Sequence, residues 1–184
     1  MGGSMADATI LLLDEFVLPP GSPGRCDAML ERDLLAHITT GPRRIVAWDT
    51  TADPAVTCAD MEAEVARGMD LAIVGLGANG HIGTNEPPSS PDSRSRLVEL
   101  APSTAAGALS YGADEAPSHA LTMGIGTLLD AEEIWLLVTG AHKRSVLDTA
   151  LHGSISPELP ASLLRRHDRF IVIADDEALP NATS

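Results

Sequence analysis

The residues with the clearest potential for chemistry lie in the stretch GLGANGHIGTNEPPSS, residues 75–90, which directly follows the apolar run LAIV. Glycines at positions 75, 77 and 80 form the pattern G-x-G-x-x-G, the spacing of a dinucleotide-binding turn. His81, Glu86 and several prolines follow at once. Taken alone, His81 fits either a group that stabilises the turn or an acid–base catalyst, because the unperturbed pKa of imidazole lies near neutrality. The stretch therefore indicates either a nucleotide phosphate site or a site for different chemistry.

The dinucleotide hypothesis requires the glycine turn to open a helix, whose N-terminus then meets the pyrophosphate. Gly83 and the prolines at positions 87, 88 and 91 prevent a sustained helix here. Glu99 follows the turn at about 20 residues, where an acid for the ribose is expected, but a lone acid at that distance is a weak signal. We therefore interpret the glycines as a backbone that approaches a small ligand closely and aims the side chains that follow.

Further polar groups follow apolar runs elsewhere in the chain. Asp14 and Glu15 come after ATILLL, and Lys143, the single lysine, comes after EIWLLVTG. By residue type alone, such an acidic pair is typical of a solvated turn and such a lysine of a helix start. Parallel strands, however, gather their carboxyl ends at one edge of a sheet. We therefore expect these groups and the 75–86 loop to converge.

Apolar runs alternate with helical segments along the whole chain. This pattern predicts the α/β fold class: a three-layer Rossmann-like sandwich with a mostly parallel sheet. The predicted strands span residues 8–14, 44–49, 70–77, 95–100, 120–124, 133–140 and 169–175. The predicted helices span 22–38, 54–67, 126–131, 141–153 and 156–167, with Ser22-Pro23 and Asp53-Pro54 starting the first two.

Composition bounds the class of protein. A chain of 184 residues with 44% hydrophobic and 21% charged residues predicts one globular domain over 1–184, with residues 1–7 expected to be disordered or an addition to the native chain. The formal net charge of −14 argues against nucleic acids and anionic membranes as partners. Neither a membrane-spanning run nor a signal peptide is recognisable, so we expect a cytoplasmic location. Cys26 and Cys58 are expected to be reduced thiols.

The 75–87 segment GLGANGHIGTNEP resembles the signature loop of glucosamine-6-phosphate deaminases, which are also called glucosamine-6-phosphate isomerases. Three more segments are similar to that family: LLLDEFVLPP (11–20), SSPDSRSR (89–96) and HALTMGIGTLLDAEEIWLLVTGAHK (119–143). The resemblance covers residues 8–178. The related lactonases that hydrolyse 6-phosphogluconolactone share the Gly-His loop but not the Asn-Glu-Pro that follows, which favours the deaminases.

The resemblance implies a reaction without metal or organic cofactor, in which an amino-sugar phosphate and water give a ketose phosphate and ammonia. It implies that His81 opens the sugar ring by moving a proton between the ring oxygen and the anomeric hydroxyl. Glu86 would orient the imidazole and stabilise its charge. Asp14 would be the base that carries a proton from C2 to C1 through an enolamine.

The resemblance also implies how the substrate is held. Lys143 would bind the phosphate with help from a helix N-terminus, and the glycines at 75, 77 and 80 would lie against the substrate. Arg96 aligns with an arginine that binds effectors in some members, although a surface cation fits equally well. Partners are thus expected to be a small amino-sugar phosphate, with a homo-oligomer, the sugar epimer and effectors left open.

Three departures from the family pattern count against catalytic competence. Asn79 stands where family members carry an Asp immediately before Gly-His. The family's opening strand and Gly-Gly-Thr-Pro phosphate loop have no counterpart, so neighbouring strand edges should be exposed. Ser110 stands near the position of a second phosphate-binding arginine. The alternatives are therefore a catalytically impaired relative that binds a sugar phosphate as a sensor or subunit, or a 6-phosphogluconolactonase-like hydrolase.

Overall fold

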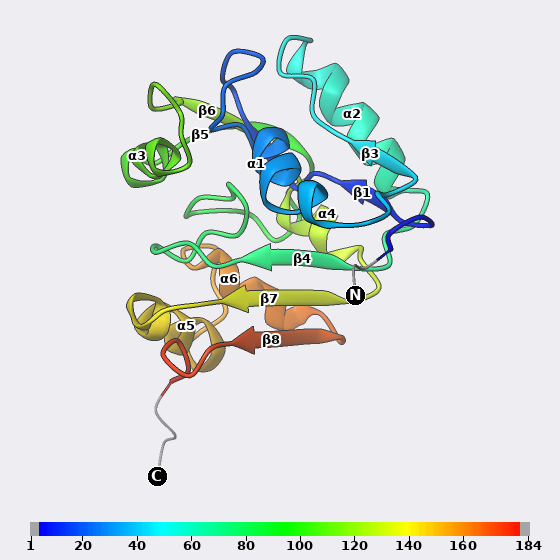
Figure 1. Ribbon diagram of the computed structural model, residues 1–184. Coiled ribbons are helices and arrows are strands. Elements are labelled where there is room, and N and C mark those ends of the chain that lie inside the picture. Colours follow the sequence, from blue (N-terminus) through cyan, green and yellow to red (C-terminus); the bar gives the residue numbers. More distant parts are fainter. Residues whose placement is uncertain (1–3, 181–184) are drawn as a thin grey trace.

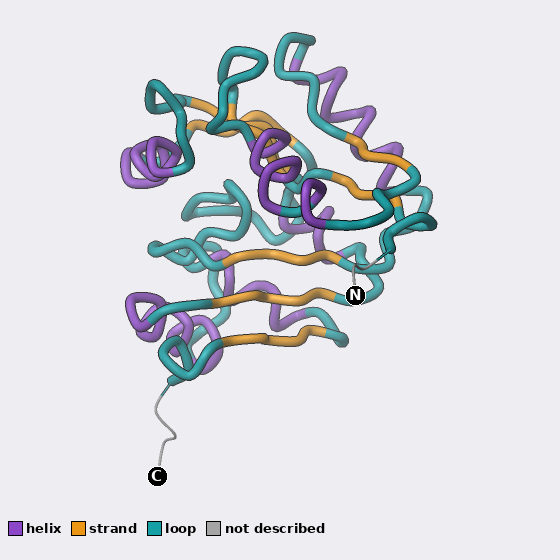
Figure 2. Tube along the Cα trace, viewed as in Figure 1, coloured by secondary structure: helices purple, strands orange, loops and turns teal. Residues whose placement is uncertain are grey.

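The computed structural model describes residues 4–180 (Figure 1). The described residues form the strands β1 (Thr9–Leu11), β2 (Asp14–Phe16), β3 (Arg44–Val46), β4 (Ala72–Gly75), β5 (Arg96–Glu99), β6 (His119–Thr122), β7 (Ile134–Val138) and β8 (Phe170–Ala174). The helices are α1 (Cys26–Asp33), α2 (Pro54–Val65), α3 (Pro102–Ser110), α4 (Ile125–Leu129), α5 (Arg144–His152) and α6 (Pro160–Leu163). Short 3-10 helices are η1 (Leu35–His37), η2 (Ala141–Lys143) and η3 (Leu164–Arg166). Figure 2 shows strands and helices mixed along the chain, which confirms the α/β class.

The strands β4, β7 and β8 form a parallel sheet in that order. Val74 pairs with Leu136, and Leu136 pairs with Val172. Both Val74 and Leu136 are buried, in one cluster with Leu128 of α4, Leu147 of α5 and Leu163 of α6. The apolar residues on this face of the sheet are therefore buried because three helices cover it.

The opposite face of the same sheet is open to solvent. Because strand side chains alternate between faces, the intervening residues Ile73, Leu137, Ile171 and Ile173 point the other way. Each of these four is between 41% and 52% exposed. The described residues thus supply helices on one side of this sheet, and the predicted third layer is incomplete there.

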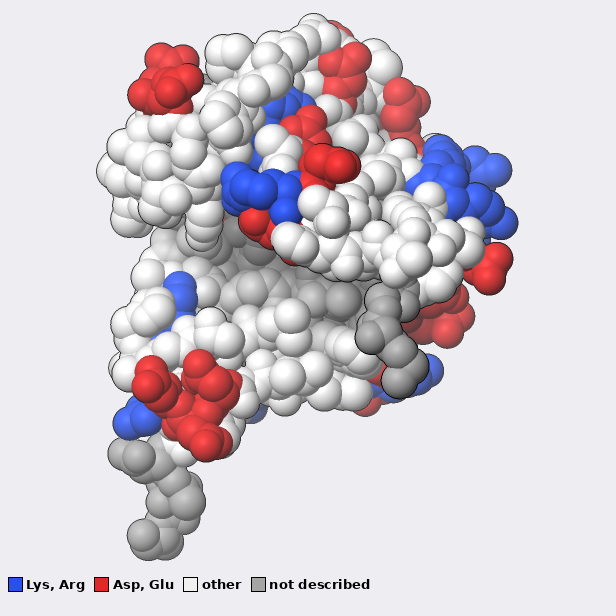
Figure 3. All heavy atoms as spheres, viewed as in Figure 1, with Lys and Arg blue, Asp and Glu red and all other residues white. Residues whose placement is uncertain are grey.

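A second parallel pair, β1 with β3, is separate from that sheet. The edge of β1 and the edge of β4 face each other across a cleft of about 1290 Å³, whose walls include Ile10, Leu12, Leu71 and Ile73. Figure 3 shows the surface hollowed between the upper and lower parts of the molecule. The prediction of exposed strand edges agrees with this arrangement.

The predicted strand over residues 8–14 is in fact two strands. The N–H of Leu12 still donates to O of Val46, the last residue of β3, but Leu13 O accepts from the N–H of Met123, which follows β6. The chain therefore crosses from one sheet to another within two residues. Asp14 then begins β2, which pairs antiparallel with β6, and β6 pairs antiparallel with β5. The sheet predicted as mostly parallel thus has a three-stranded antiparallel part.

The observed helix starts show which local sequence signals predicted a helix correctly. Asp53 caps α2 as predicted, because its side chain accepts from the N–H of Ala55 at 2.8 Å. Ser22-Pro23 does not start a helix: α1 begins only at Cys26, and its N-cap residue Arg25 makes no side-chain capping bond. The helix α3 was not predicted at all.

The first described residues of the chain contact the segment before β3. Residues 1–3 lie outside the described residues, but Ser4 forms a bridge with Thr40, and the N–H of Met5 donates to Thr40 O. The expectation that residues 1–7 are disordered or an addition to the native chain stays a prediction.

Both cysteines are free thiols. Among the helices of residues 4–180, none has the length and apolar character needed to cross a membrane.

Candidate active site

The loop after β4 folds back on itself and presents His81. Leu76 bridges to Ile82, and the N–H of Gly77 donates to His81 O at 2.9 Å. The imidazole lies directly against Gly77, so that a Cβ at this position would overlap the ring. Gly77 is therefore required by the position of the histidine, and the G-x-G-x-x-G spacing reflects this packing.

Gly80 has a different requirement. Its φ is +86°, a conformation that L side chains rarely adopt, and a Cβ there would collide with Leu159. Gly75, in contrast, has open space where a side chain would stand. The described loop contains no helix after Gly80, so the pyrophosphate site of a dinucleotide turn is not formed, in agreement with the argument from the prolines.

Asn85 fixes the loop to the antiparallel sheet. It is fully buried, and its Nδ2 donates to Ile82 O at 2.9 Å and to Met123 O at 2.8 Å. The first bond closes the loop, and the second attaches it to the residue that follows β6. Asn85 therefore carries the loop, with His81 and Glu86, to the end of the sheet where Asp14 lies.

His81 and Glu86 form a pair, as the sequence suggested. His81 Nδ1 lies 3.4 Å from Glu86 Oε2, and both side chains are mostly buried. Burial lowers the pKa of His81 most strongly, the carboxylate of Glu86 raises it, and the positive charge of Lys143 lowers it further. The pKa of Glu86 is also lowered, because donors including Thr104 and Asn79 outweigh burial. At neutral pH the pair is therefore an ionised carboxylate beside a neutral imidazole.

Asn79 binds the carboxylate of this pair. Its Oδ1 accepts from the backbone N–H of His81 at 3.1 Å, so its Nδ2 faces Glu86 Oε2 and donates at 2.8 Å. The backbone N–H can only donate, which settles the orientation of the amide. A carboxylate at position 79 would instead place like charges together. In this chain, Asn79 therefore supports the ionised form of Glu86.

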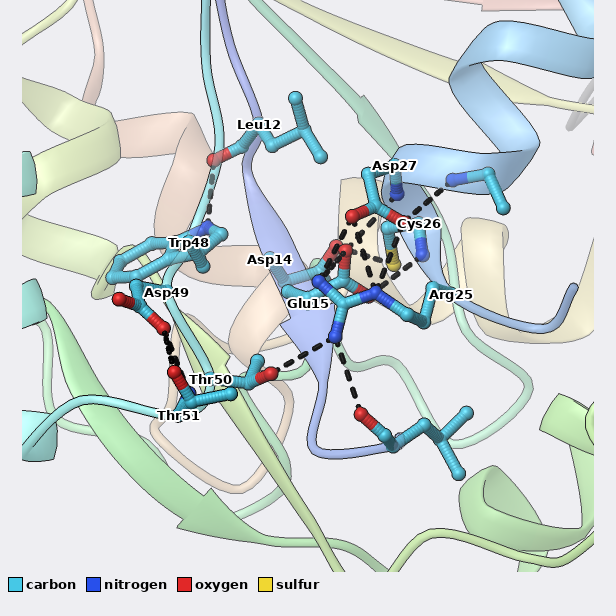
Figure 4. A network of polar contacts seen from close by, with 12 residues as sticks. Leu12, Asp14, Glu15, Arg25, Cys26, Asp27, Trp48, Asp49, Thr50 and Thr51 are labelled. Carbon is cyan, nitrogen blue, oxygen red and sulfur yellow. Dashed lines mark hydrogen bonds and ion pairs between the residues drawn. The ribbon is translucent and has the colours of Figure 1, made fainter. Parts of the chain in front are cut away.

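Asp14 lies at the start of β2, opposite Thr122 of β6. Its Oδ1 is 3.7 Å from the thiol of Cys26 (Figure 4). Burial, followed by the charge of Glu15, raises the pKa of Asp14 to about 6, although the Cys26 thiol opposes the shift. A carboxyl group with a pKa near the working pH is well suited to accept and return a proton.

Glu15, next in the chain, has a structural position. Its carboxylate is fully buried and accepts from the backbone N–H groups of Cys26 at 2.7 Å and Asp27 at 3.0 Å, which are the first two residues of α1. Arg25 Nη2 lies 3.3 Å away. The same guanidinium bonds Asp27, Thr50 and Leu18 O. Glu15 thus caps α1 and holds β2, with Asp14 on it, against that helix.

Two cations were singled out from the sequence, Lys143 for the substrate phosphate and Arg96 for an effector, and they occupy different places. Lys143 is half-buried at the end of η2, near enough to His81 to influence its pKa, and burial lowers its own pKa. Arg96 is half-buried and donates to Ser89 Oγ at 3.2 Å and Arg94 O at 3.3 Å. Ser110 is exposed and donates to Gly107 O. The charge of Lys143 therefore acts on His81, whereas Arg96 bonds residues of the 89–94 segment.

Two polar residues near the site were not singled out from the sequence. Thr104 lies 3.3 Å from His81 Nδ1, and Asn85 holds the loop. The Pro102 that precedes Thr104 at a helix start was an available signal for α3. Among residues 4–180, no three His, Cys, Asp or Glu side chains form a cluster able to hold a metal ion.

The fold and this geometry define a class: an α/β protein with a buried histidine–carboxylate pair on the loop that follows β4. The sequence pattern of the family described as glucosamine-6-phosphate isomerases/6-phosphogluconolactonase matches residues 4–172. The chain belongs to this family.

Similar proteins agree with that assignment. The glucosamine-6-phosphate deaminase of Cutibacterium acnes is 37% identical over 183 residues, which are 96% of this chain and 70% of that protein. The deaminase of Hahella chejuensis is 39% identical, over 90% of this chain and 66% of its own length. A solved monomeric glucosamine-6-phosphate deaminase superposes with a TM-score of 0.87 at 34% identity, over 95% of this chain and 75% of that one. A 6-phosphogluconolactonase of Thermotoga maritima, with a TM-score of 0.69 and 19% identity, shares the fold.

Proposed function

We propose that this chain is a deaminase of amino-sugar phosphates, which converts glucosamine 6-phosphate and water into fructose 6-phosphate and ammonia. The observation that carries the proposal is the loop after β4, which holds the His81–Glu86 pair and lies against Asp14, since a Cβ at Gly83 of this loop would stand 3.3 Å from Asp14 Oδ2. The pKa of Asp14 is about 6. The relatives at 36–39% identity are named for this reaction.

Ring opening is assigned to His81. The reaction moves the proton of the anomeric hydroxyl to the ring oxygen, and the C1–O5 bond breaks as the C1 carbonyl forms. A neutral imidazole can take the first proton and return it to the second oxygen. Glu86, ionised and held by Asn79, stabilises the imidazolium that forms in between.

Isomerisation is assigned to Asp14. The carboxylate removes the proton from C2 of the open sugar, which gives an enolamine, and then returns it to C1. The product is an imine at C2. Water adds to that carbon and ammonia leaves, so that a ketone remains. All steps are proton transfers or addition and loss of neutral molecules, and the balance requires no electron acceptor.

Phosphate binding is assigned to Lys143, with the open space at Gly75 and the backbone of the 75–80 turn next to the sugar. Few cations lie near this region in a chain with a net charge of −14, so we expect weak phosphate affinity and a high KM. This charge pattern also fits the second candidate, a relative that binds a sugar phosphate without turning it over. Arg96 is retained as a candidate effector contact.

The test is release of ammonia from glucosamine 6-phosphate by the purified protein, with His81→Gln and Asp14→Asn as inactive references and circular dichroism as the check of folding. The proposal predicts release that both substitutions abolish. A folded wild-type protein that binds the sugar phosphate in calorimetry but releases no ammonia would support the sensor candidate instead. Faster hydrolysis of 6-phosphogluconolactone than release of ammonia would assign the chain to the lactonases.

A further inference from the structure

The His81–Glu86 pair has a third neighbour on the helix that the sequence did not predict. Thr104 is the third residue of α3, in the turn that begins with Pro102. Its Oγ1 lies 3.3 Å from Nδ1 of His81. The N–H of Ala101, directly before the helix, donates to Glu86 Oε1 at 3.4 Å. The first turn of α3 therefore contacts both members of the pair.

We propose that Thr104 is a positioning residue of this site, whose hydroxyl oxygen accepts from Nδ1–H of His81 and so holds the imidazole in one tautomer. A hydroxyl has one proton to donate and two lone pairs to accept with. Glu86 Oε2 lies 3.4 Å from the same ring nitrogen, and an ionised carboxylate can only accept, so the proton of the neutral ring belongs on Nδ1. A lone pair of the Thr104 hydroxyl then accepts from that N–H.

The consequence for His81 is the identity of its reactive nitrogen. Nδ1 faces two oxygens, Glu86 Oε2 at 3.4 Å and Thr104 Oγ1 at 3.3 Å, and both act as acceptors. In the neutral ring the free lone pair is then on Nε2, which becomes the atom that exchanges protons with the sugar. This role in turnover rests on the proposed function, whereas the tautomer itself does not.

Thr104 and Asn79 act on different parts of the pair. Asn79 bonds the carboxylate of Glu86 and the backbone of His81. Thr104 bonds the imidazole itself and attaches the pair to α3. The buried Ala108 anchors this helix in a cluster with Phe16 of β2 and Leu100. The orientation of the ring therefore depends on a helix that packs against the β2 side of the molecule, where Asp14 lies.

The direct test measures the tautomer. Thr104→Val keeps the side-chain shape without the hydroxyl, and Thr104→Ser keeps the hydroxyl without the methyl group. Ser103→Ala, at the exposed neighbouring position, is the matched control. The ¹⁵N resonances of the imidazole are recorded for each protein, and the His81 signals are identified by their absence in His81→Gln.

We expect Nδ1–H in the wild type, in Thr104→Ser and in Ser103→Ala. In Thr104→Val the ratio of Nδ1–H to Nε2–H should fall about fivefold to tenfold, the equivalent of one neutral hydrogen bond. An unchanged ratio in Thr104→Val overturns the proposal. A Thr104→Ser protein that behaves like Thr104→Val also overturns it, because packing of the methyl group would then be responsible. Thr104→Ala gives the same comparison if the valine protein does not fold.

Kinetics separate positioning from substrate binding. Thr104→Val should lower kcat for ammonia release about fivefold to tenfold with KM changed less than about twofold, and Thr104→Ser should restore kcat. A wild-type protein that releases no ammonia, but whose tautomer ratio depends on the hydroxyl, refutes the deaminase function and supports the positioning role. Equal kcat values for wild type and Thr104→Val refute the positioning role and leave the deaminase function standing.

Discussion

The two parallel sheets on either side of the cleft are built differently. The β4–β7–β8 sheet has three strands in register, and one of its faces is closed by α4, α5 and α6. The β1–β3 pair has two strands, and its continuation turns away into the antiparallel β2–β6–β5 sheet. The loop after β4 of the first sheet carries His81 and Glu86. Asp14 lies on β2, in the antiparallel sheet into which the second sheet continues. The proposed site therefore depends on contacts that join two unequal halves.

Those contacts gather at the carboxyl ends of the strands. Asn85 bonds Met123 O, Met123 bonds Leu13 O, and Glu15 holds β2 to α1. The cleft between the edges of β1 and β4 reaches this end, since Leu13, Asp14 and Met123 are among the residues that line it. The position of the proposed site therefore does not require one continuous sheet, because buried polar side chains such as Asn85 and Glu15 fix the strand ends relative to one another.

The largest effect on activity should come from Asp14, on β2. Asp14→Asn removes the proposed base and should lower kcat/KM for ammonia release by about 10²–10⁴. In the wild type, kcat/KM should rise with pH through about 6, because Asp14 must lose its proton to act and its pKa is raised to that value. Steady-state kinetics between pH 4.5 and pH 8, with exposed Asp92→Asn as control, measure both. A wild-type profile that is flat across pH 6 contradicts the assignment.

The second largest effect should come from Glu15, which caps α1 and holds β2 against it. Glu15→Ala should lower the free energy of unfolding by about 3–5 kcal/mol, because it leaves Arg25 buried without this partner and removes the acceptor from the start of α1. Urea denaturation measures the change, and Glu99→Ala on exposed β5 should stay within about 0.5 kcal/mol. A loss below about 1 kcal/mol would show that Asp27 and Thr50 suffice to satisfy the guanidinium.

The two faces of the β4–β7–β8 sheet allow a paired test. Leu136→Ala on the buried face should cost about 2–5 kcal/mol of unfolding free energy. Ile73→Ala on the open face, 52% exposed, should cost less than about 1 kcal/mol. Equal losses in urea denaturation would mean that the open face is covered in solution.

The smallest effect should come from Asn79→Asp. The new carboxylate would stand beside that of Glu86, so like-charge repulsion should raise the pKa of Glu86 and move the acid limb of the kcat/KM profile to higher pH. Because the pKa of Glu86 starts below its ordinary value, a rise of about one unit should lower activity less than about twofold near pH 6 and more at lower pH. Higher activity than the wild type at every pH would show instead that His81 needs the acid that family members carry.

Much of the fold could be predicted because its signals are local. The strands over residues 70–77, 133–140 and 169–175 are continuous apolar runs, and Asp53-Pro54 is a self-contained helix start. The split of the 8–14 run could not be predicted, since it depends on whether Leu13 pairs with a strand more than 100 residues away. The helix α3, with the sequence PSTAAGALS, has no charged residue and no clear amphipathic period.

The residues of the proposed site also divide into those that the sequence predicts and those that it does not. His81, Glu86 and Asp14 follow from motif and resemblance. The partners that tune them do not, because each is set by tertiary contact. Ser22-Pro23 looked like the start of the first helix, whereas the acceptor at that start is Glu15, eleven residues before Cys26. The bond from Asn79 to Glu86 exists because the loop folds back, which residue spacing alone does not specify.

The open edges and the open apolar face have a consequence for handling the protein. Unpaired strand edges and contiguous apolar side chains favour contact between molecules, while a net charge of −14 keeps the molecules apart. Salt weakens only the second effect, since the screening length falls to about 10 Å at 0.1 M. Light scattering should therefore show a protein that is monodisperse at low ionic strength and associates as salt is added, the reverse of a protein whose assembly depends on ion pairs.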